Sequence, residues 1–146
     1  MTGKKYELAN KRSEALVIHC LDHRFQGAFA KYIEDELEIK VFNPIVVAGG
    51  ALPIASDHYA KFGYIWDQVD FFVNEVGISR IILINHQDCL WYKYEHPDYT
   101  EQGLIDLGSS DLKEAAGNIK YKHPGIEIIP VWAAVEGNEI KFERLT

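Results

Sequence analysis

The sequence predicts an α/β fold with an open, mostly parallel sheet and helices on both faces, a Rossmann-like three-layer arrangement. We expect about four parallel strands plus an antiparallel edge strand. Short β-branched apolar runs, typical of strands buried on both faces, alternate with segments whose apolar residues recur at helical spacing. Near the end of the chain, apolar and polar residues alternate instead, which is typical of a half-exposed edge strand. Together, these patterns predict repeated βαβ units closed by a hairpin.

Each predicted element rests on its own local signal. The first helix is expected to be capped by Asp22, and Pro44 makes the start of the second strand irregular because proline cannot donate a ladder hydrogen bond. Ser56 or Asp57 can cap the longest apolar helical stripe, which stops at Gly77. The predicted order is a strand at 15–18, a helix at 25–39, a strand at 45–48, a helix at 57–76, a strand at 78–85, a polar and aromatic connection at 87–108, a helix at 110–122, a strand at 126–135, a Gly137-Asn138 turn and a last strand around 140–143.

Length and charge limit the class of protein. A chain of 146 residues can bury one sizeable core without disulfides, so we expect a single domain over residues 1–146, with 1–13 as a flexible or peripheral segment. Its 22 acidic and 15 basic residues give a net charge of -7, which argues against nucleic acid as a partner. The longest uncharged run, residues 45–55, is broken by glycines and Pro53 and is too short to span a membrane. With no secretory signal behind the first basic residues, the expected location is cytoplasmic.

The two cysteines offer the main functional clue. Cys20 and Cys89 each follow a predicted buried strand, and His86 precedes the second by three residues. Working residues in open α/β sheets gather at the carboxyl ends of strands, so a common site is reasonable. Two thiolates and one imidazole suit zinc, and three protein ligands with an open fourth position describe a catalytic site. The alternative is that each cysteine is simply a small buried apolar residue.

A charged pair lies two residues beyond the first cysteine. Asp22 and Arg24 can form paired hydrogen bonds that keep the carboxylate ionised and fix its orientation. One carboxylate oxygen would then accept a hydrogen bond from another group, such as a zinc-bound water. The alternative is an ordinary capping aspartate beside a surface arginine.

These residues resemble the β-class carbonic anhydrases. That family has Cys-x-Asp-x-Arg after its first strand and His-x-x-Cys after a later one, matched here by Cys20, Asp22 and Arg24 and by His86 and Cys89. The resemblance extends to the turn at 47–50, the long helix from residue 57, the isoleucine-rich strand before His86 and the closing segment 126–145. It therefore covers the chain from about residue 14 onward.

The resemblance implies a zinc lyase of the carbonic anhydrase type. Such an enzyme reversibly hydrates carbon dioxide to bicarbonate by a zinc-bound hydroxide, and it assembles as homodimers or higher homo-oligomers. Carried over by position, Cys20, His86 and Cys89 are the ligands of one zinc ion per chain. Asp22 and Arg24 are then the catalytic dyad that orients the metal-bound water.

The sequence departs from the family pattern around the site. Val46 replaces an arginine, Gly50 replaces an asparagine, and Asn85 and Leu90 replace the glycines that flank His-x-x-Cys. Trp91 and Tyr92 follow, so we expect an altered pocket wall. This change favours, as alternatives, a hydrolase of carbonyl sulfide or carbon disulfide, or a non-catalytic zinc-binding relative. A metal-free nucleotide-binding domain with its ligand at Gly49 and Gly50 is a further possibility.

Several residues near the motifs carry weaker predictions. Gly49 and Gly50 are expected to line the pocket, and His23 and His58 could shuttle protons, because histidine titrates near neutral pH. The alternative for both histidines is an exposed turn or helix-start position. Asp88 is expected to be a solvated loop residue or a partner of a metal ligand.

Overall fold

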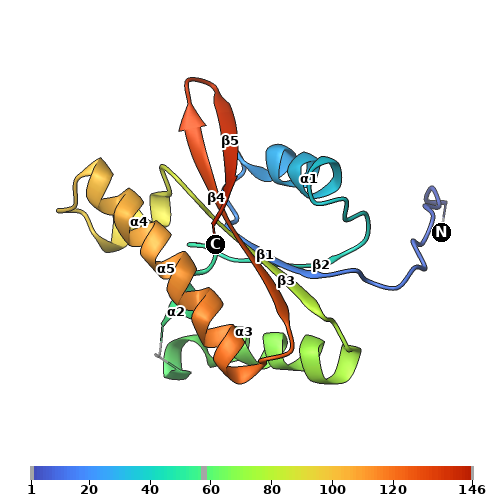
Figure 1. Ribbon diagram of the computed structural model, residues 1–146. Helices are drawn as coiled ribbons and strands as arrows, with labels where there is room; N and C mark the ends of the chain where they lie inside the picture. Colours follow the sequence, from blue (N-terminus) through green and yellow to red (C-terminus); the bar gives the residue numbers. More distant parts are fainter. Residues whose placement is uncertain (1, 57–58, 146) are drawn as a thin grey trace.

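In the computed structural model, which describes residues 2–56 and 59–145, five strands form one sheet in the order β2-β1-β3-β4-β5 (Figure 1). The first four strands are parallel, and β5 runs antiparallel to β4. The strands are β1 Leu16–His19, β2 Asn43–Val46, β3 Arg80–His86, β4 Glu127–Glu136 and β5 Glu139–Arg144. The predicted fold class is confirmed. Because the chain goes from β1 to one neighbour, β2, and later to the other, β3, the carboxyl ends of β1 and β3 form the crevice where such sheets bind ligands.

Helices cover both faces of this sheet. Helix α1 packs on one face, while α2, α3 and α5 pack on the other (Figure 1). The last turn of α3 continues as a π-helical turn, η1, and ends at Gly77, whose φ of 82° is favourable for glycine. The helices are α1 Gln26–Asp35, α2 Leu52–Ala55, α3 Tyr59–Phe71, η1 Phe72–Val76, α4 Leu90–Glu95 and α5 Glu101–Lys122.

The central strands are apolar throughout because both faces of the sheet are covered. Along β1, Leu16 and Ile18 belong to the core beneath α3 and α5, whereas Val17 belongs to the core beneath α1. Along β3, Ile81 and Ile82 divide in the same way. This alternation explains why the sequence reads as continuous apolar runs rather than as alternating ones.

The start of the first predicted helix differs from the structure. Helix α1 begins at Gln26, and Asp22 does not cap it, because the Asp22 carboxylate is bound to Arg24 instead. Of the two caps expected for the long helix, Ser56 is the C-cap of α2. The long helix begins at Tyr59, and its expected cap at Asp57 lies outside the described residues.

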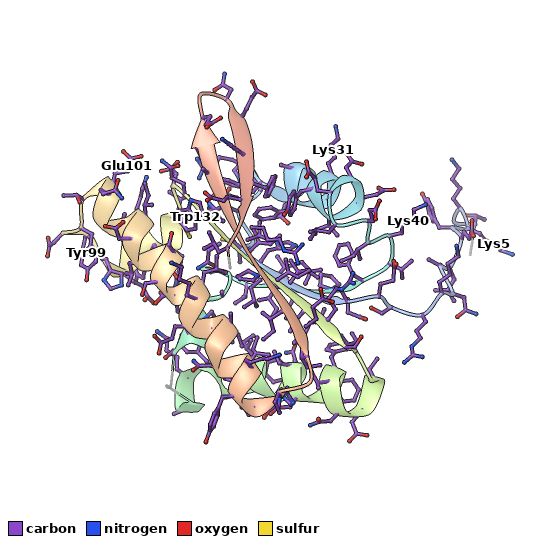
Figure 2. All side chains as sticks on the ribbon, viewed as in Figure 1. Lys5, Lys31, Lys40, Tyr99, Glu101 and Trp132 are labelled. Carbon is purple, nitrogen blue, oxygen red and sulfur yellow. The ribbon has the colours of Figure 1, made fainter. Side chains whose placement is uncertain are left out.

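The connection predicted for residues 87–108 is largely helical. It contains α4 and the first turns of α5, whose N-cap is Thr100 rather than Ser110. Thr100 Oγ1 accepts a hydrogen bond from the backbone N–H of Gly103 at 3.0 Å. The helical signal was weak because glycines interrupt this half of α5. At Gly108 the missing side chain makes room for Trp132, which points from β4 toward α5 (Figure 2).

The hairpin predicted at the end of the chain is formed. Gly137 and Asn138 join β4 to β5 as a two-residue turn, with a φ of 62° at Gly137. Residues 2–12 form no helix or strand and are exposed, and Lys5 lies well away from the sheet (Figure 2). Within the described residues, none of the helices combines the length and the apolar character that a bilayer-crossing segment needs.

Candidate metal centre

Three elements bring the predicted ligands together. Cys20 directly follows β1, His86 is the last residue of β3, and Cys89 is the N-cap of α4. All three are buried, and their potential ligand atoms lie within 4.8 Å of one another. The parallel pairing of β1 with β3 produces this cluster, because it places the carboxyl ends of the two strands side by side.

The histidine is oriented for metal binding. Its Nδ1 lies 2.7 Å from the carbonyl oxygen of Gln87, which can only accept a hydrogen bond, so Nδ1 carries the proton. Nε2 keeps its lone pair, is buried and has no hydrogen-bond partner among the described residues. The ring of Phe25 packs against the imidazole, with centroids 3.9 Å apart. In a metal-binding histidine, one ring nitrogen usually donates its hydrogen to a backbone carbonyl or a similar acceptor, while the other nitrogen binds the metal.

The environment of the two sulfur atoms favours one thiolate, at Cys20. The pKa of Cys20 is lowered, first because Cys89 donates a hydrogen bond to its sulfur, and then because the backbone N–H groups of Asp22 and Gly49 point at the same sulfur. The pKa of Cys89 is raised, mainly because the Cys20 thiolate is its neighbour and because it is buried. Backbone N–H groups of α4 still point at the Cys89 sulfur. Two sulfurs sharing one negative charge beside an unpaired nitrogen fit a zinc ion, which would take the place of the proton between them.

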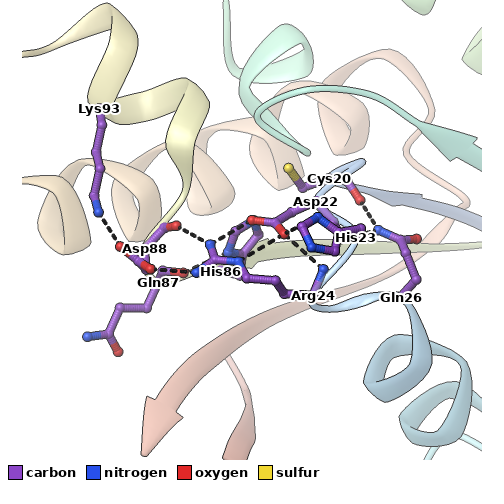
Figure 3. Close-up of polar contacts among 9 residues, drawn as sticks. All are labelled: Cys20, Asp22, His23, Arg24, Gln26, His86, Gln87, Asp88 and Lys93. Carbon is purple, nitrogen blue, oxygen red and sulfur yellow. Dashed lines mark hydrogen bonds and ion pairs between the residues drawn. The ribbon is translucent and has the colours of Figure 1, made fainter. Parts of the chain in front are cut away.

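Asp22 is paired with Arg24 rather than directed at the cluster. Arg24 donates from Nε to Oδ1 at 3.1 Å and from Nη2 to Oδ2 at 2.7 Å, and its backbone N–H donates to Oδ1 at 3.0 Å (Figure 3). These hydrogen bonds, chiefly those from the Arg24 side chain, hold the pKa of the Asp22 carboxyl below its usual range. Asp22 is therefore ionised and fixed at neutral pH, beside the three candidate ligands.

The same guanidinium also reaches the second motif. Arg24 Nη1 donates to Asp88 Oδ2 at 2.8 Å, and Nη2 donates to the Asp88 carbonyl oxygen at 2.9 Å. Lys93, on α4, donates to the other carboxylate oxygen of Asp88 (Figure 3). Asp88 thus lies between Arg24 and Lys93 and forms an ion pair with each of them, rather than being a free loop residue.

A small cavity opens beside Cys20 and Asp22. Its volume is about 200 Å³. Asp22 is the one charged residue among those that line it, and its carboxylate is already engaged by Arg24. The lining residues are Cys20, Leu21, Asp22, Ala48, Leu90 and Trp91. Such a cavity suits a small neutral molecule. Its wall includes Leu90, which departs from the family pattern, and Trp91, the next residue in the sequence.

The two glycines after β2 are in close contact with the site. Both have positive φ values, 84° at Gly49 and 60° at Gly50. A Cβ atom at Gly50 would come within 2.6 Å of Asn85 Oδ1, and one at Gly49 within 3.0 Å of Trp91. The space into which a Cβ atom of either glycine would extend is thus occupied, and neither glycine is among the residues that line the cavity beside Cys20.

Asn85 is buried, and its hydrogen bonds connect four segments of the chain. Its Oδ1 accepts from the backbone N–H of Ala51 at 2.8 Å, and its Nδ2 donates to the Gly108 carbonyl at 2.9 Å. Nδ2 also contacts the hydroxyl of Tyr92 at 3.4 Å, and that hydroxyl donates to Asp111 at 2.7 Å. The residue before His86 therefore links β3 to the turn after β2 and to α4 and α5.

Of the two histidines suggested as proton shuttles, the structure describes His23. The His23 side chain is 93% exposed and lies 4.0 Å from Asp22 Oδ1. His58 lies outside the described residues. Gln26, which the sequence analysis did not single out, donates to the backbone carbonyls of Cys20 and Asp22 at 2.9 and 2.6 Å. Its position in the first turn of the helix after the cysteine motif was the only sequence signal for this role.

Comparisons with known proteins agree with this geometry. Residues 10–143 match the model of a family described as "Putative carbonic anhydrase". A comparison with curated protein sequences finds no significant match.

Several solved structures have a similar fold. The β-carbonic anhydrase CafA of Aspergillus fumigatus is 12% identical, with a TM-score of 0.57 over 92% of this chain and 76% of that one. β-Carbonic anhydrase isoform I of Trichomonas vaginalis is 15% identical, with a TM-score of 0.58 over 94% and 87% of the two chains. Tetrameric β-carbonic anhydrases of Sordaria macrospora include a chain that is 14% identical, with a TM-score of 0.57 over 93% and 84%. At these identities the likeness establishes the fold, and since the family model spans nearly the whole sequence, the chain belongs to this carbonic anhydrase family.

Proposed function

We propose that the protein is a zinc enzyme that reversibly hydrates carbon dioxide to bicarbonate. The observation that carries this proposal is the buried cluster of Cys20, His86 and Cys89, in which His86 Nε2 has no hydrogen-bond partner within residues 2–56 and 59–145. Zinc held by these three residues would lower the pKa of a bound water molecule to about 7 and so supply hydroxide at neutral pH.

The remaining steps belong to the chain's own residues. Asp22, kept ionised by Arg24, accepts a hydrogen bond from the attacking oxygen and so aims that oxygen's lone pair at the substrate carbon. The apolar wall of the cavity, chiefly Leu90 and Trp91, admits a neutral linear molecule and keeps bulk water away from it. His23, exposed beside Asp22, can then pass the released proton to buffer.

Two measurements test this proposal in sequence. Elemental analysis of protein purified without a metal-affinity tag is expected to find close to one zinc per chain, and stopped-flow assays should then show carbon dioxide hydration above the buffer rate. Cys89→Ser is expected to lose both zinc and activity. A fully zinc-loaded protein whose hydration rate equals that of buffer would overturn the proposed reaction.

The apolar cavity wall supports a second candidate reaction. Carbonyl sulfide and carbon disulfide are also neutral and linear, and their sulfur atoms are less strongly solvated than the oxygens of carbon dioxide. A sulfide-release assay on the same zinc-loaded preparation distinguishes these substrates from carbon dioxide. A zinc-binding protein without catalytic activity would give neither product.

We also infer a homo-oligomer of single-domain chains that works in a reducing, cytoplasmic environment. The structures from Sordaria macrospora are described as tetrameric, which supports the assembly, and the family match over residues 10–143 supports one domain. A reducing compartment would keep Cys20 and Cys89 available as metal ligands. Sedimentation velocity over a range of protein concentrations tests the assembly, with a monomer at all concentrations as the contrary result.

A further inference from the structure

We propose that Asp88, supported by Lys93, is a positioning residue that holds the Arg24 guanidinium in its pairing geometry with Asp22. The kinetic part of this inference rests on the proposed hydration reaction. The structural part does not, because it concerns contacts that the chain makes before any substrate binds.

The argument begins with the geometry of Arg24. A guanidinium presents its N–H donors in one rigid plane, so fixing one edge fixes the direction of the others. One edge, Nε and Nη2, meets both oxygens of Asp22 at 3.1 and 2.7 Å. The other edge, through Nη1, meets Asp88 Oδ2 at 2.8 Å, and Nη2 also donates to the Asp88 carbonyl. Two carboxylates thus hold one plane from opposite sides.

Exposure explains why a second carboxylate is needed. The Asp22 side chain is 5% exposed, but that of Arg24 is 41% exposed. A half-exposed arginine paired with a single carboxylate loses much of its orientation to solvent competition and to side-chain entropy. A second partner, 64 residues away in the chain and in the turn between β3 and α4, restrains the guanidinium from the side that faces solvent. Asp88 therefore limits rotation of Arg24 away from Asp22.

Lys93 completes the arrangement. Its ammonium group bonds Asp88 Oδ1, which leaves Oδ2 for Arg24 (Figure 3). Lys93 also lies on α4, one turn after Cys89. The ion pairs of Asp88 with Lys93 and with Arg24 therefore connect the start of α4 to the Cys20 motif. The functional consequence is that Asp22 stays with Arg24 and does not turn toward the candidate metal position.

The backbone at Asp88 determines which substitutions are informative. Its φ is 61°, a left-handed conformation that asparagine and glycine accept but alanine does not. Asp88→Gly removes the carboxylate without adding strain, and its backbone carbonyl still accepts from Arg24. Asp88→Asn keeps an oxygen acceptor of the same shape and serves as the conservative rescue. Glu127→Gln is the matched control, because Glu127 pairs with the half-exposed Arg80 at 3.0 Å at the opposite end of the sheet.

The direct readout is the Arg24 Nε–H signal in ¹⁵N NMR of the zinc-loaded protein, assigned by its loss in Arg24→Lys. Hydrogen exchange of this group is expected to be at least about fivefold faster in Asp88→Gly than in the wild type, and intermediate in Asp88→Asn. Glu127→Gln is expected to leave it unchanged. An unchanged exchange rate in Asp88→Gly would overturn the proposal whatever the enzyme's activity.

The kinetic readout is a division of the effect between kcat and KM. In Asp88→Gly we expect kcat for carbon dioxide hydration to fall about tenfold, with KM within about twofold and zinc content unchanged, and Asp88→Asn to recover most of the loss. A loss that appears equally in Glu127→Gln, or one that follows zinc content, would instead indicate a general structural effect and contradict the assignment. If wild-type protein hydrates no carbon dioxide, the proposed function fails, while the NMR measurement still decides the role of Asp88.

Discussion

Gly50 and Asn85 form a contact that accounts for two departures from the family pattern. The β-class family that the chain resembles has asparagine at the first position and glycine at the second, whereas this chain has the reverse. In the structure, the Asn85 side chain occupies the space into which a side chain at residue 50 would extend, with only 2.6 Å between a Cβ there and Oδ1. This chain therefore carries the side-chain amide at residue 85 instead of residue 50, and the amide fits there because residue 50 has no side chain.

This pairing predicts non-additive effects on stability. Gly50→Asn alone should cost about 2–4 kcal/mol from steric overlap, and Asn85→Gly alone a similar amount, because Ala51 N–H and the Gly108 carbonyl lose their partner. The double variant should be at least about 1 kcal/mol more stable than the sum of the single changes implies, since asparagine tolerates the positive φ. The contact of residue 50 with the Ile84 carbonyl prevents full recovery.

Urea unfolding of the zinc-free variants measures this coupling. Gly117→Ala is a suitable control, because a Cβ there meets no atom within 4 Å, and helix propensity should make it neutral or stabilising. Strict additivity of the two changes would contradict the interpretation of residues 50 and 85 as a matched pair.

The contact between helices α3 and α5 includes a pH-sensitive charge cluster. Asp70 on α3 lies 2.8 Å from His123 Nε2 and 3.0 Å from Lys122 Nζ, both at the end of α5. Partial burial raises the pKa of Asp70, but the hydrogen bonds from His123 and Lys122 outweigh it and lower the pKa overall. The cluster therefore joins the carboxyl-terminal ends of two helices on the same face of the sheet.

A lowered carboxyl pKa determines the direction of the pH effect. The stability that Asp70 contributes is present above its unfolded pKa of about 3.9 and is lost as the pH falls through the lower folded pKa. Asp70→Asn is expected to cost about 1 kcal/mol at pH 7, where partial exposure limits the effect. The difference in unfolding free energy between this variant and the wild type should narrow from about pH 4 downward. A constant difference from pH 7 to pH 2.5 would contradict this account.

For the molecule as a whole, the metal centre joins parts of the chain that are remote in sequence. Its three candidate ligands come from the end of β1, the end of β3 and the start of α4. A metal bound only by the folded arrangement stabilises that arrangement by mass action, by about 4 kcal/mol at a free concentration one thousand times the dissociation constant. The crevice is thus both the candidate reaction site and a cross-link of the sheet.

Removal of the metal should therefore lower the thermal stability of the protein. We expect a chelator to reduce Tm by several degrees and added zinc to restore it. Calorimetry of Cys89→Ser, which lacks one ligand, should show no such zinc-dependent shift. A wild-type Tm that is independent of both chelator and zinc would count against metal binding at this site.

Local patterns in the sequence sufficed for the fold class and for most strands and helices. Apolar periodicity and turn residues such as Gly77 and Gly137 act over a few neighbouring positions, so they can be read without knowing the rest of the chain. The cluster of Cys20, His86 and Cys89 was also predictable, because carboxyl ends of adjacent parallel strands meet. Helix α4 and the start of α5 were missed because their apolar contacts are with residues elsewhere in the chain, as where Trp132 fits against Gly108.

The contacts around the ligands depended on which segments became neighbours in space. The sequence allowed Asp22 to cap a helix or to pair with Arg24, and the second arrangement is the one formed. Asp88 looked like a loop residue until the β1 and β3 ends placed it beside Arg24. The fit of Asn85 against Gly50 has the same origin. The contacts of Asp88 with Arg24 and of Asn85 with Gly50 join residues more than thirty positions apart. Their geometry follows from strand order and side-chain packing, which no local pattern records.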